Sequence, residues 1–318
     1  MDRIPGIGQL TRTLAGPVVV TIGNFDGVHL GHRQIFEQVV HKAREGRGTS
    51  VAYTFRPHPQ VALRPGSRLP MLSTYDERAE LIGACGIDVL IEEPFSREVS
   101  TTSPQSFFTD VILRRLSAAE VIVGYDFAFG KGREGSLEVL WELCRSAGVT
   151  LTVVPPHKIG TEVVSSSRIR QHLLAGQVSD AARLLGRGFF YRGTVVRGSQ
   201  RGRTIGFPTA NLRLEDKLAL PYGVYATKAV LDDGREFASV TNVGVRPTFE
   251  AAVVGSELPA LIETHLLDTT IDLYGRTLEV RFFERIREER KFPGLDALKA
   301  QIAQDAQRAR GLLTGKKG

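Results

Sequence analysis

Two histidines three residues apart, His29 and His32, lie in a glycine-rich stretch that reads GNFDGVHLGH and begins at Gly23. The β-branched apolar run at 17–22 predicts a buried strand before it, and apolar residues at helical spacing within 34–43 predict a helix after it. A turn between a strand and a helix N-terminus presents unpaired backbone N–H groups and the positive end of the helix dipole. Because such a corner favours an anion, we interpret the stretch as a nucleotide triphosphate site to which the imidazoles add donors.

Two other interpretations of this stretch are weaker. A glycine-rich turn between a strand and a helix can be only a tight connection. The histidines could also form half of a zinc site, but Cys85 and Cys144 are far apart and no second closely spaced pair would complete a tetrahedron. The pattern differs from the GxGxxG dinucleotide fingerprint and from GxxxxGK[ST]. A phosphate site is therefore favoured over a metal site and over a plain turn.

The composition is that of a mildly basic globular protein. Of the 318 residues, 42% are hydrophobic and 24% are charged, and the net charge is +6 with a pI near 9.4. No dense basic stripe with interleaved aromatic residues indicates nucleic acid as a partner. Two cysteines give no disulfide framework and suit a reducing compartment. Without an apolar signal segment or a run of about 20 apolar residues, we expect a cytoplasmic protein that does not bind a membrane.

The first half of the chain, residues 1–186, alternates short apolar runs with helical patterns. Strands separated by helices predict an α/β fold with a doubly wound parallel sheet, in which ligands bind beyond the carboxyl ends of the strands. Residues 1–16 are expected to be an irregular lead-in. The expected strands are 17–22, 50–55, 87–91, 120–124 and 149–154, and the expected helices lie near 33–44, 74–85, 104–116 and 137–147.

Unusual side chains follow several of these strands. The segment RPHP presents His58, the segment GYDFAFGKG contains Asp126 and Phe127, and the segment SSSRIR opens a helix. Each has an ordinary explanation, as a turn histidine, as core aromatics or as an N-cap serine. Their common place at one edge of a sheet favours a site, in which guanidinium groups suit a polyphosphate and aromatic rings suit a flat heterocycle. The residues concerned in SSSRIR are Ser166, Ser167, Arg168 and Arg170.

The second half, residues 187–318, is rich in strands and turns and ends in a helix. The Asp-Gly turn at 233–234 between alternating runs is typical of a hairpin. Several strands with one terminal helix predict a small antiparallel β-barrel, and the absence of an internal repeat indicates two unlike domains. The expected strands are 189–196, 225–231, 236–243, 261–267 and 277–283, and the helix is expected near 294–312.

A basic, glycine-rich loop in this half ends in two neutral oxygen ligands. The Thr209 hydroxyl and the Asn211 amide oxygen can ligate a hard cation such as Mg²⁺, with nucleotide phosphates completing the shell. The loop N–H groups and Arg203 can hold phosphate oxygens. Glu263, on an expected strand, could act as a general base, although an exposed loop and a solvated rim carboxylate are the ordinary alternatives. We expect Gly198, Gly202, Arg203 and Pro208 to lie against a bound nucleotide.

The motifs GNFDGVHLGH, PHP, GYDFAFGKGREG and SSSRIR together resemble the adenylyltransferase module of the bacterial bifunctional riboflavin kinase/FAD synthetases, which has an HxGH nucleotidyltransferase fold. The resemblance implies that the two histidines contact the phosphates of ATP and that the serine and arginines of SSSRIR close on them. His58, Asp126 and the flanking aromatics would lie near the FMN or adenine pockets. Two departures are Arg56, where the family often has Glu, and Ser167, where it has Thr. The binding residues expected in this module are Gly23, Phe25, Asp26, Gly27, His58, Asp126, Phe127, Ser166 and Ser167, with His29, His32, Arg168 and Arg170 as catalytic residues.

The motifs GRTIGFPTANL, GVYA, NVGVRPTF and ETHLLD resemble the riboflavin kinase module of the same family, in the same order and spacing. The resemblance implies that Thr209 and Asn211 hold Mg²⁺ and that Glu263 deprotonates the riboflavin 5′-hydroxyl for attack on the γ-phosphate. Three further residues would border the flavin site. A departure is the segment from 250 to 260, which is more apolar than the family pattern. The bordering residues are Asn242, Arg246 and Thr248.

The two resemblances lead us to expect one bifunctional enzyme of flavin cofactor synthesis. It would phosphorylate riboflavin to FMN and adenylylate FMN to FAD, using ATP, Mg²⁺ and flavins, with small molecules as its partners and an oligomer as possible but not required. The alternatives are a riboflavin kinase with a degenerate or regulatory N-terminal domain, and a flavin- or nucleotide-binding regulatory protein without turnover. The retained GVHLGH and SSRIR motifs argue against the first, and Glu263 beside the predicted metal ligands argues against the second.

Overall fold

The computed structural model describes the chain except for residues 64–68, 198–205, 214–216, 246–259, 270 and 315–318. It contains two compact units, Met1–Ser166 and Ser167–Gly318, and the positions of these units relative to one another are not determined. Among the described residues, no helix is both long enough and apolar enough to cross a membrane.

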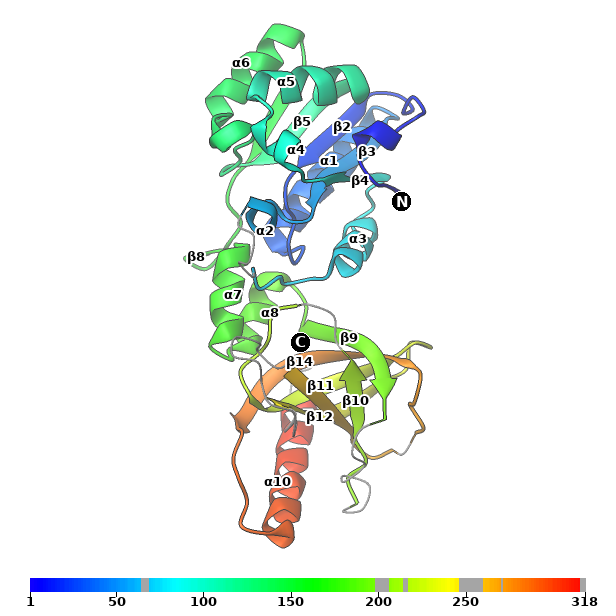
Figure 1. Cartoon of the computed structure of the whole chain (residues 1–318), viewed down its shortest axis with the longest axis vertical. Coiled ribbons are helices and arrows are strands. Elements are labelled where there is room, and N and C mark those ends of the chain that lie inside the picture. The colour runs from blue at the N-terminus through cyan, green and yellow to red at the C-terminus, as the bar shows by residue number, and fades with distance from the viewer. Residues whose placement is uncertain (64–68, 198–205, 214–216, 246–259, 270, 315–318) are drawn as a thin grey trace. The chain divides into compact units, whose positions relative to one another are not determined.

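The first unit contains a six-stranded parallel sheet with helices on both faces (Figure 1), so the predicted doubly wound fold is confirmed. The strand order is β1-β4-β3-β2-β5-β6, and every pairing within it is parallel. The expected irregular lead-in is wrong at residues 2–4, which pair with β4 as an edge strand too short and polar for a strand pattern. The strands are β1 (Asp2–Ile4), β2 (Val18–Ile22), β3 (Thr49–Arg56), β4 (Val89–Pro94), β5 (Ala118–Gly124) and β6 (Thr150–Val154).

The helices of the first unit begin and end at the residues that the sequence marks for capping. The Thr74 hydroxyl and the Glu77 side chain form a capping box at the start of the helix Tyr75–Ala84. Ser136 caps the helix Leu137–Ala147, which ends at Gly148 in the left-handed conformation. The expected helix at 104–116 is a short α-helix capped by Ser103 that continues as a π-helix over Phe108–Arg115. The α-helices are α1 (Leu30–Glu45), α2 (Pro59–Leu63), α3 (Tyr75–Ala84), α4 (Arg97–Thr101), α5 (Pro104–Phe107) and α6 (Leu137–Ala147), and 3₁₀ turns lie at Ile7–Gln9 and Lys131–Arg133.

Alternate residues of the central strands bury two separate apolar layers. Val18 and Val20 of β2 face a layer completed by α5, the π-helix and α6, whereas Val19 faces a layer completed by α1 and α3. This alternation follows from the two-residue period of a strand and explains why both faces of the sheet must be covered. The carboxyl ends of the strands therefore provide the edge at which polar groups can gather.

A short hairpin and two helices follow the sheet. The hairpin pairs β7 (Lys158–Ile159) with β8 (Glu162–Val163). Helix α7 (Ser166–Leu174) begins at the last residue of the first unit, and α8 (Val178–Leu185) packs against strands of the second. The domain boundary that the sequence predicts at 186/187 stays a prediction.

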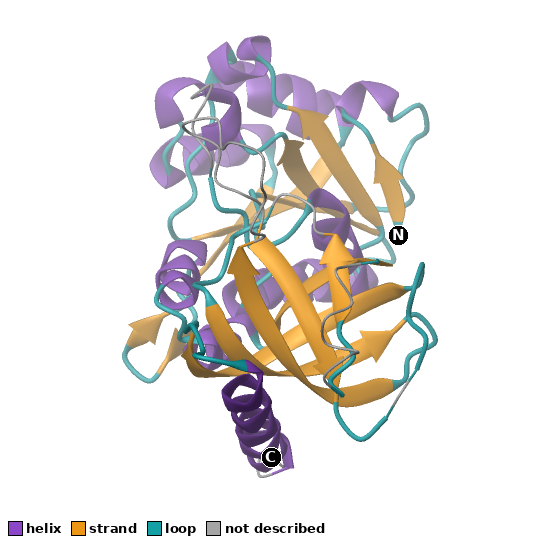
Figure 2. Ribbon diagram, turned by 60° about the horizontal axis from the view of Figure 1, so that its bottom comes forward, coloured by secondary structure: helices purple, strands orange, loops and turns teal. Residues whose placement is uncertain are grey.

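The second unit is a closed six-stranded antiparallel barrel followed by a helix, and this confirms the fold predicted for it (Figure 2). The strands close in the order β10-β13-β12-β11-β14-β9, with β10 pairing β9. The sequence analysis missed β10, because four residues directly after a glycine-rich loop show little alternation. The elements are β9 (Phe189–Val196), β10 (Ala210–Arg213), β11 (Gly223–Leu231), β12 (Glu236–Val245), β13 (Ala260–Leu266), β14 (Thr277–Glu288) and α10 (Leu295–Thr314).

A buried ion pair fastens α10 to the barrel. Asp305 is 3% exposed and accepts hydrogen bonds from Arg287 of β14, at 3.1 and 3.0 Å from Nε and 2.8 Å from Nη2. The Gln301 amide donates to the same carboxylate at 2.8 Å. Around them, apolar residues of α10 such as Ala306 and Ala309 pack on β11, β12 and β14. Helix α10 is therefore part of the barrel's core.

The substitution Asp305→Ala is expected to destabilise the barrel by about 2 kcal/mol, because it removes the buried carboxylate that the half-buried Arg287 guanidinium and the Gln301 amide contact. Thermal unfolding followed by circular dichroism measures this loss. Arg310→Ala is the matched control, since it removes the exposed ion pair that the same helix makes with Asp268. We expect the control to leave the melting midpoint unchanged. Equal midpoints for the two variants would contradict the role given to Asp305.

Candidate active sites

The turn after β2 has an unusual backbone. Phe25, Gly27 and Val28 all have positive φ, of 50°, 79° and 41°, although only one of them is glycine. Gly23 opens the turn by donating its N–H to the Tyr53 carbonyl of β3 at 3.1 Å. Such conformations persist only where the surrounding structure holds them. The turn is thus a built feature that sets how the chain enters α1.

His29 and His32 meet at the N-terminus of α1. The imidazole of His29 caps the helix, accepting the His32 N–H on Nδ1 at 3.3 Å. The two rings stack with centroids 3.5 Å apart and an angle of 18° between their planes. The buried ring of Phe25 meets the His32 ring edge-on at 5.3 Å. The predicted pair is therefore brought together at a helix end, where imidazole donors and the helix dipole favour the same anion.

Gly31, between the two histidines, lies in a tightly packed place. An added Cβ would lie 3.3 Å from Cε1 and Nδ1 of His29 and 3.7 Å from the Cβ of His157. The sequence analysis did not select His157, which follows the sixth strand. Its Nδ1 is 3.0 Å from the Gln34 amide oxygen on α1. The structure thus adds a third imidazole beside the pair, and only the spatial approach of two distant segments reveals it.

Asp26 and Gly27 brace the turn. The Asp26 carboxylate is 2% exposed and accepts the Leu72 N–H at 3.0 and 3.1 Å and the Ser73 N–H at 3.2 Å. Gly27 donates its N–H to the Ser73 hydroxyl at 3.1 Å, and the Asp26 carbonyl accepts from the Ser166 hydroxyl at 3.0 Å. Of the residues predicted to bind a ligand here, Asp26 and Phe25 are buried. The hydrogen bonds of Asp26 to Leu72 and Ser73 hold the turn in place.

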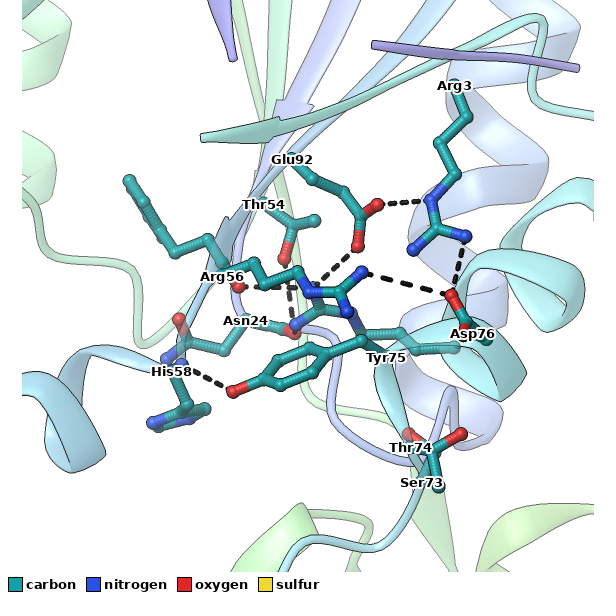
Figure 3. Close-up of polar contacts among 12 residues, drawn as sticks. Arg3, Asn24, Thr54, Arg56, His58, Ser73, Thr74, Tyr75, Asp76 and Glu92 are labelled. Atoms are coloured by element: carbon teal, nitrogen blue, oxygen red, sulfur yellow. Dashed lines mark hydrogen bonds and ion pairs between the residues drawn. The ribbon is translucent and has the colours of Figure 1, made fainter. Parts of the chain in front are cut away.

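The segment after β3 is fastened in a similar way. The N–H of His58 donates to the Tyr75 hydroxyl at 2.9 Å, and its Nδ1 accepts the Gln60 N–H at 3.2 Å (Figure 3). The His58 side chain is 5% exposed. Arg56 lies over the Tyr75 ring at 4.9 Å and 3.8 Å from the Asp76 carboxylate. The guanidinium that departs from the family pattern therefore has a defined place against α3.

The other predicted residues of this module lie after β5 and at the start of α7. Asp126 is exposed, and Phe127 stacks on the buried Phe129 with ring centroids 5.5 Å apart. Phe127 thus packs against the hydrophobic core, as expected of a core aromatic residue. At the start of α7, the side chains point to different environments. Ser166 and Arg170 are half-buried, whereas Ser167 and Arg168 are exposed, with Arg168 donating to Gln171 at 3.2 Å.

In the barrel, the strand register places three predicted site residues side by side on adjacent strands. Glu263 of β13 is the partner of Asn211 on β10 and of Asn242 on β12. Directly opposed residues on neighbouring strands point to the same face of the sheet, within reach of one another. Asn211 is 5% exposed and the other two are half-buried. A carboxylate flanked by two amides is thus built by the backbone ladder itself.

Thr209 lies just before β10, at the mouth of a cavity. The cavity has a volume of about 430 Å³, and Pro208, Thr209, Thr264 and Tyr274 are among the residues that line it. The Pro208 carbonyl accepts from His265 Nδ1 at 2.8 Å, which fixes the approach of the loop to β13. Predicted residues outside the described part of the chain are Gly198, Gly202, Arg203, Arg246 and Thr248, together with most of the apolar segment 250–260.

The residues present suit a hard cation in this second site. A hydroxyl, an amide oxygen and a nearby carboxylate are oxygen donors of the kind that Mg²⁺ accepts when phosphates complete its shell. Among the described residues, no group of three or more His, Cys, Asp or Glu side chains is placed to hold a metal. A cation bound at Thr209 and Asn211 would accordingly depend on the nucleotide for its remaining ligands.

Comparison with known proteins covers both halves of the chain. The FAD synthetase family model matches residues 12–168, and the riboflavin kinase model matches residues 185–313. The bifunctional riboflavin kinase/FMN adenylyltransferase of Escherichia coli is 36% identical over 310 residues, which cover 98% of this chain and 97% of that protein. The protein of the same name from Listeria monocytogenes is 33% identical, covering 92% of this chain and 91% of its own.

The fold also matches a solved structure over its full length. A crystal structure described as a macrolide-efflux protein from Streptococcus pneumoniae superposes with a TM-score of 0.86 at 30% identity, covering 98% of this chain and 99% of that one. The match supports the fold of both units. With both family models matched and full-length relatives above 30% identity, this chain belongs to the family of bifunctional riboflavin kinase/FMN adenylyltransferases.

Proposed function

We propose that each unit carries one of the two activities of the family. The barrel transfers the γ-phosphoryl group of ATP to the 5′-hydroxyl of riboflavin, and the parallel-sheet unit transfers AMP from ATP to FMN. The observation that carries the second assignment is the stacked pair His29 and His32 at the N-terminus of α1. Two imidazoles that lie together at a helix N-terminus are suited to binding a polyphosphate.

In the adenylyl transfer, an oxygen of the FMN phosphate forms a bond to the α-phosphorus of ATP. The bond from that phosphorus to the bridging oxygen breaks, and pyrophosphate leaves with the electron pair. Because no covalent enzyme intermediate is required, catalysis consists of orientation and charge stabilisation. His29 and His32 donate to phosphate oxygens at the N-terminus of α1. Arg168 and Arg170 of α7 carry guanidinium groups of the kind that bind phosphate.

The remaining predicted residues of this unit have supporting roles in the proposal. Ser166 and Ser167 provide hydroxyls at the start of α7, and Gly23 and Gly27 let the backbone approach the phosphates. Asp26 and Phe25 shape the turn, since a carboxylate committed to backbone N–H groups is not directed at a ligand. His58, Asp126 and Phe127 border the flavin or adenine, with Phe127 held by its stacking on Phe129.

In the phosphoryl transfer, Glu263 accepts the proton of the riboflavin 5′-hydroxyl as its oxygen bonds to the γ-phosphorus and ADP leaves. Asn211 and Asn242, its neighbours on both sides, orient the carboxylate and the flavin. Thr209 and Asn211 would hold Mg²⁺, whose chemistry is to neutralise charge on the β- and γ-phosphate oxygens. The cavity beside Thr209 suits part of the nucleotide. Gly198, Gly202, Arg203, Pro208, Arg246 and Thr248 complete the proposed nucleotide and flavin contacts.

The test of the whole proposal is a time course with riboflavin, ATP and Mg²⁺, in which the flavins are separated chromatographically. FMN that forms first and then declines as FAD forms would support both assignments. FMN without FAD, also when FMN is supplied directly, would overturn the assignment of the first unit. Conversion that persists unchanged after divalent cations are chelated would overturn the role given to Mg²⁺.

Single substitutions are expected to separate the two activities. His32→Ala removes an imidazole from α1 and should abolish FAD formation while leaving FMN formation at its normal rate. Glu263→Ala removes the proposed base and should lower FMN formation by 10²-fold or more, with FAD formation from supplied FMN retained. Both rates are measured on each variant by chromatography. Loss of both activities in either variant would contradict the assignment of one activity to each unit.

Gly31→Ala is expected to lower the rate of FAD formation severalfold, because its Cβ would lie 3.3 Å from the His29 ring, which must shift slightly to accept it. The fold should be retained, since alanine is favourable in a helix. Gly83→Ala in α3 is the control, because its Cβ would meet only the flexible Met1 side chain. Equal rates of FAD formation for the two alanine variants would contradict the role of the stacked pair.

A further inference from the structure

One guanidinium group joins the ends of three neighbouring strands in the parallel sheet. Arg78 of α3 is fully buried, with a side chain that is 0% exposed. Its Nη1 donates to the carbonyl of Asn24, just beyond β2, at 3.0 Å, and its Nη2 donates to the carbonyl of Phe55 in β3 at 3.1 Å. The same Nη2 lies 3.4 Å from the Glu92 carboxylate of β4. Both carbonyls belong to the segments that carry the proposed substrate contacts.

This arrangement is a costly way to stabilise a core. Burial lowers the pKa of Arg78, while the Glu92 carboxylate opposes that change, and the guanidinium stays charged because arginine titrates far above neutrality. A buried ion pair often contributes less to stability than apolar residues of similar volume would. The charge of Glu92 is moreover shared with Arg3, which also contacts Asp76 at 2.7 Å (Figure 3). Neutralising Glu92 therefore does not by itself require Arg78.

The same helix also holds the segment after β3. Tyr75, the first residue of α3, accepts the His58 N–H through its hydroxyl. Two guanidinium groups lie over its ring, Arg78 at 5.0 Å and Arg56 at 4.9 Å from the centroid. Arg78 thus contacts the ring whose hydroxyl accepts from His58, and it also donates to the carbonyls of Asn24 and Phe55.

The turn after β2 also makes hydrogen bonds to the residues just before α3. Asp26 accepts the N–H groups of Leu72 and Ser73, directly before the Thr74 cap of α3, and Gly27 donates to the Ser73 hydroxyl. The start of α3 is thus tied to this turn in both directions. Hydrogen bonds to a charged group are stronger than neutral ones, and a buried one leaves its partners little freedom. Helix α3 therefore sets the spacing between the two segments.

We propose that Arg78 is a positioning residue for adenylyl transfer, which holds the turn at 23–28 and the segment at 55–58 in the relative placement that brings the two substrates into line. The proposal rests on the proposed function of this unit. Arg78 touches neither substrate and acts through the carbonyls of Asn24 and Phe55 and through Tyr75. A misplacement of about 1 Å between reacting groups can cost 10²-fold in rate, so a loosened tie is expected to lower kcat.

The test compares Arg78→Lys with Arg3→Lys in the full chain. Lysine keeps the positive charge near Glu92, but a single ammonium cannot reproduce a planar fork that reaches two carbonyls and a carboxylate. Arg3→Lys changes the other partner of Glu92 and touches neither carbonyl. We expect kcat for FAD formation from FMN and ATP to fall about tenfold or more in Arg78→Lys. Arg3→Lys should stay close to the parent, and riboflavin phosphorylation should be unchanged in both.

Tyr75→Phe provides a second, milder variant. It keeps the ring under the guanidinium groups and removes only the acceptor for the His58 N–H. We expect the KM for one substrate, the one that the segment at 55–58 borders, to rise severalfold while the KM for the other stays unchanged. If Arg78→Lys does not retain a folded first unit in thermal unfolding, this variant decides alone. Unchanged KM values for both FMN and ATP would then overturn the proposal.

Two outcomes separate this inference from the function on which it rests. A parent protein that forms no FAD would refute the proposed function of the unit, whatever the variants do. A parent that forms FAD, with equal kcat values for Arg78→Lys and Arg3→Lys, would refute the positioning role alone. A fall in kcat confined to Arg78→Lys, with equal melting temperatures for the two lysine variants, would support it, because a merely structural role would move stability instead.

Discussion

A buried carboxylate and a buried guanidinium hold the turn at 23–28 against α3 from opposite directions. Asp26 reaches from the turn to the backbone before α3, and Arg78 reaches from α3 to the backbone of the turn. Each of these groups has been taken out of water, so each requires its partners to stay in place. That requirement explains how Phe25 and Val28 can keep left-handed conformations without being glycine. The direction in which α1 begins, and with it the stacking of its two histidines, follows from this turn.

The barrel places its polar side chains by another means. Glu263 is set between Asn211 and Asn242 by the hydrogen-bonded register of three strands, and no long side chain is required to hold it. A register slip of one residue would exchange Glu263 with its buried neighbour Thr264, whose hydroxyl is bonded to that of Thr241, so the buried interior specifies the site together with the fold. The pairing of β10 with β9 closes the barrel and fixes β10, the strand that carries Asn211.

Much of the fold followed from the sequence because its signals are local. Apolar runs, capping residues such as Ser103 and Gly148, and the Asp-Gly turn each act within a few residues. The strands β1 and β10 were missed because they are short and are defined by their partners. The same limit applies to the site. Arg78 stands in the sequence between Glu77 and Glu80 and looks like part of a solvated helix face, and only the position of the sheet shows that it is buried.

Arg56 differs in charge from the residue of the family pattern, and its contacts in this chain suit a cation. The family pattern that the sequence resembles has glutamate at this position, and a carboxylate there would be repelled by a nearby Asp76. In this chain the guanidinium is 3.8 Å from Asp76 and lies over the ring of Tyr75, as that of Arg78 also does. Both contacts are favourable for a cation. Because Tyr75 accepts the His58 N–H, the charge at position 56 acts on the same ring that holds the segment after β3.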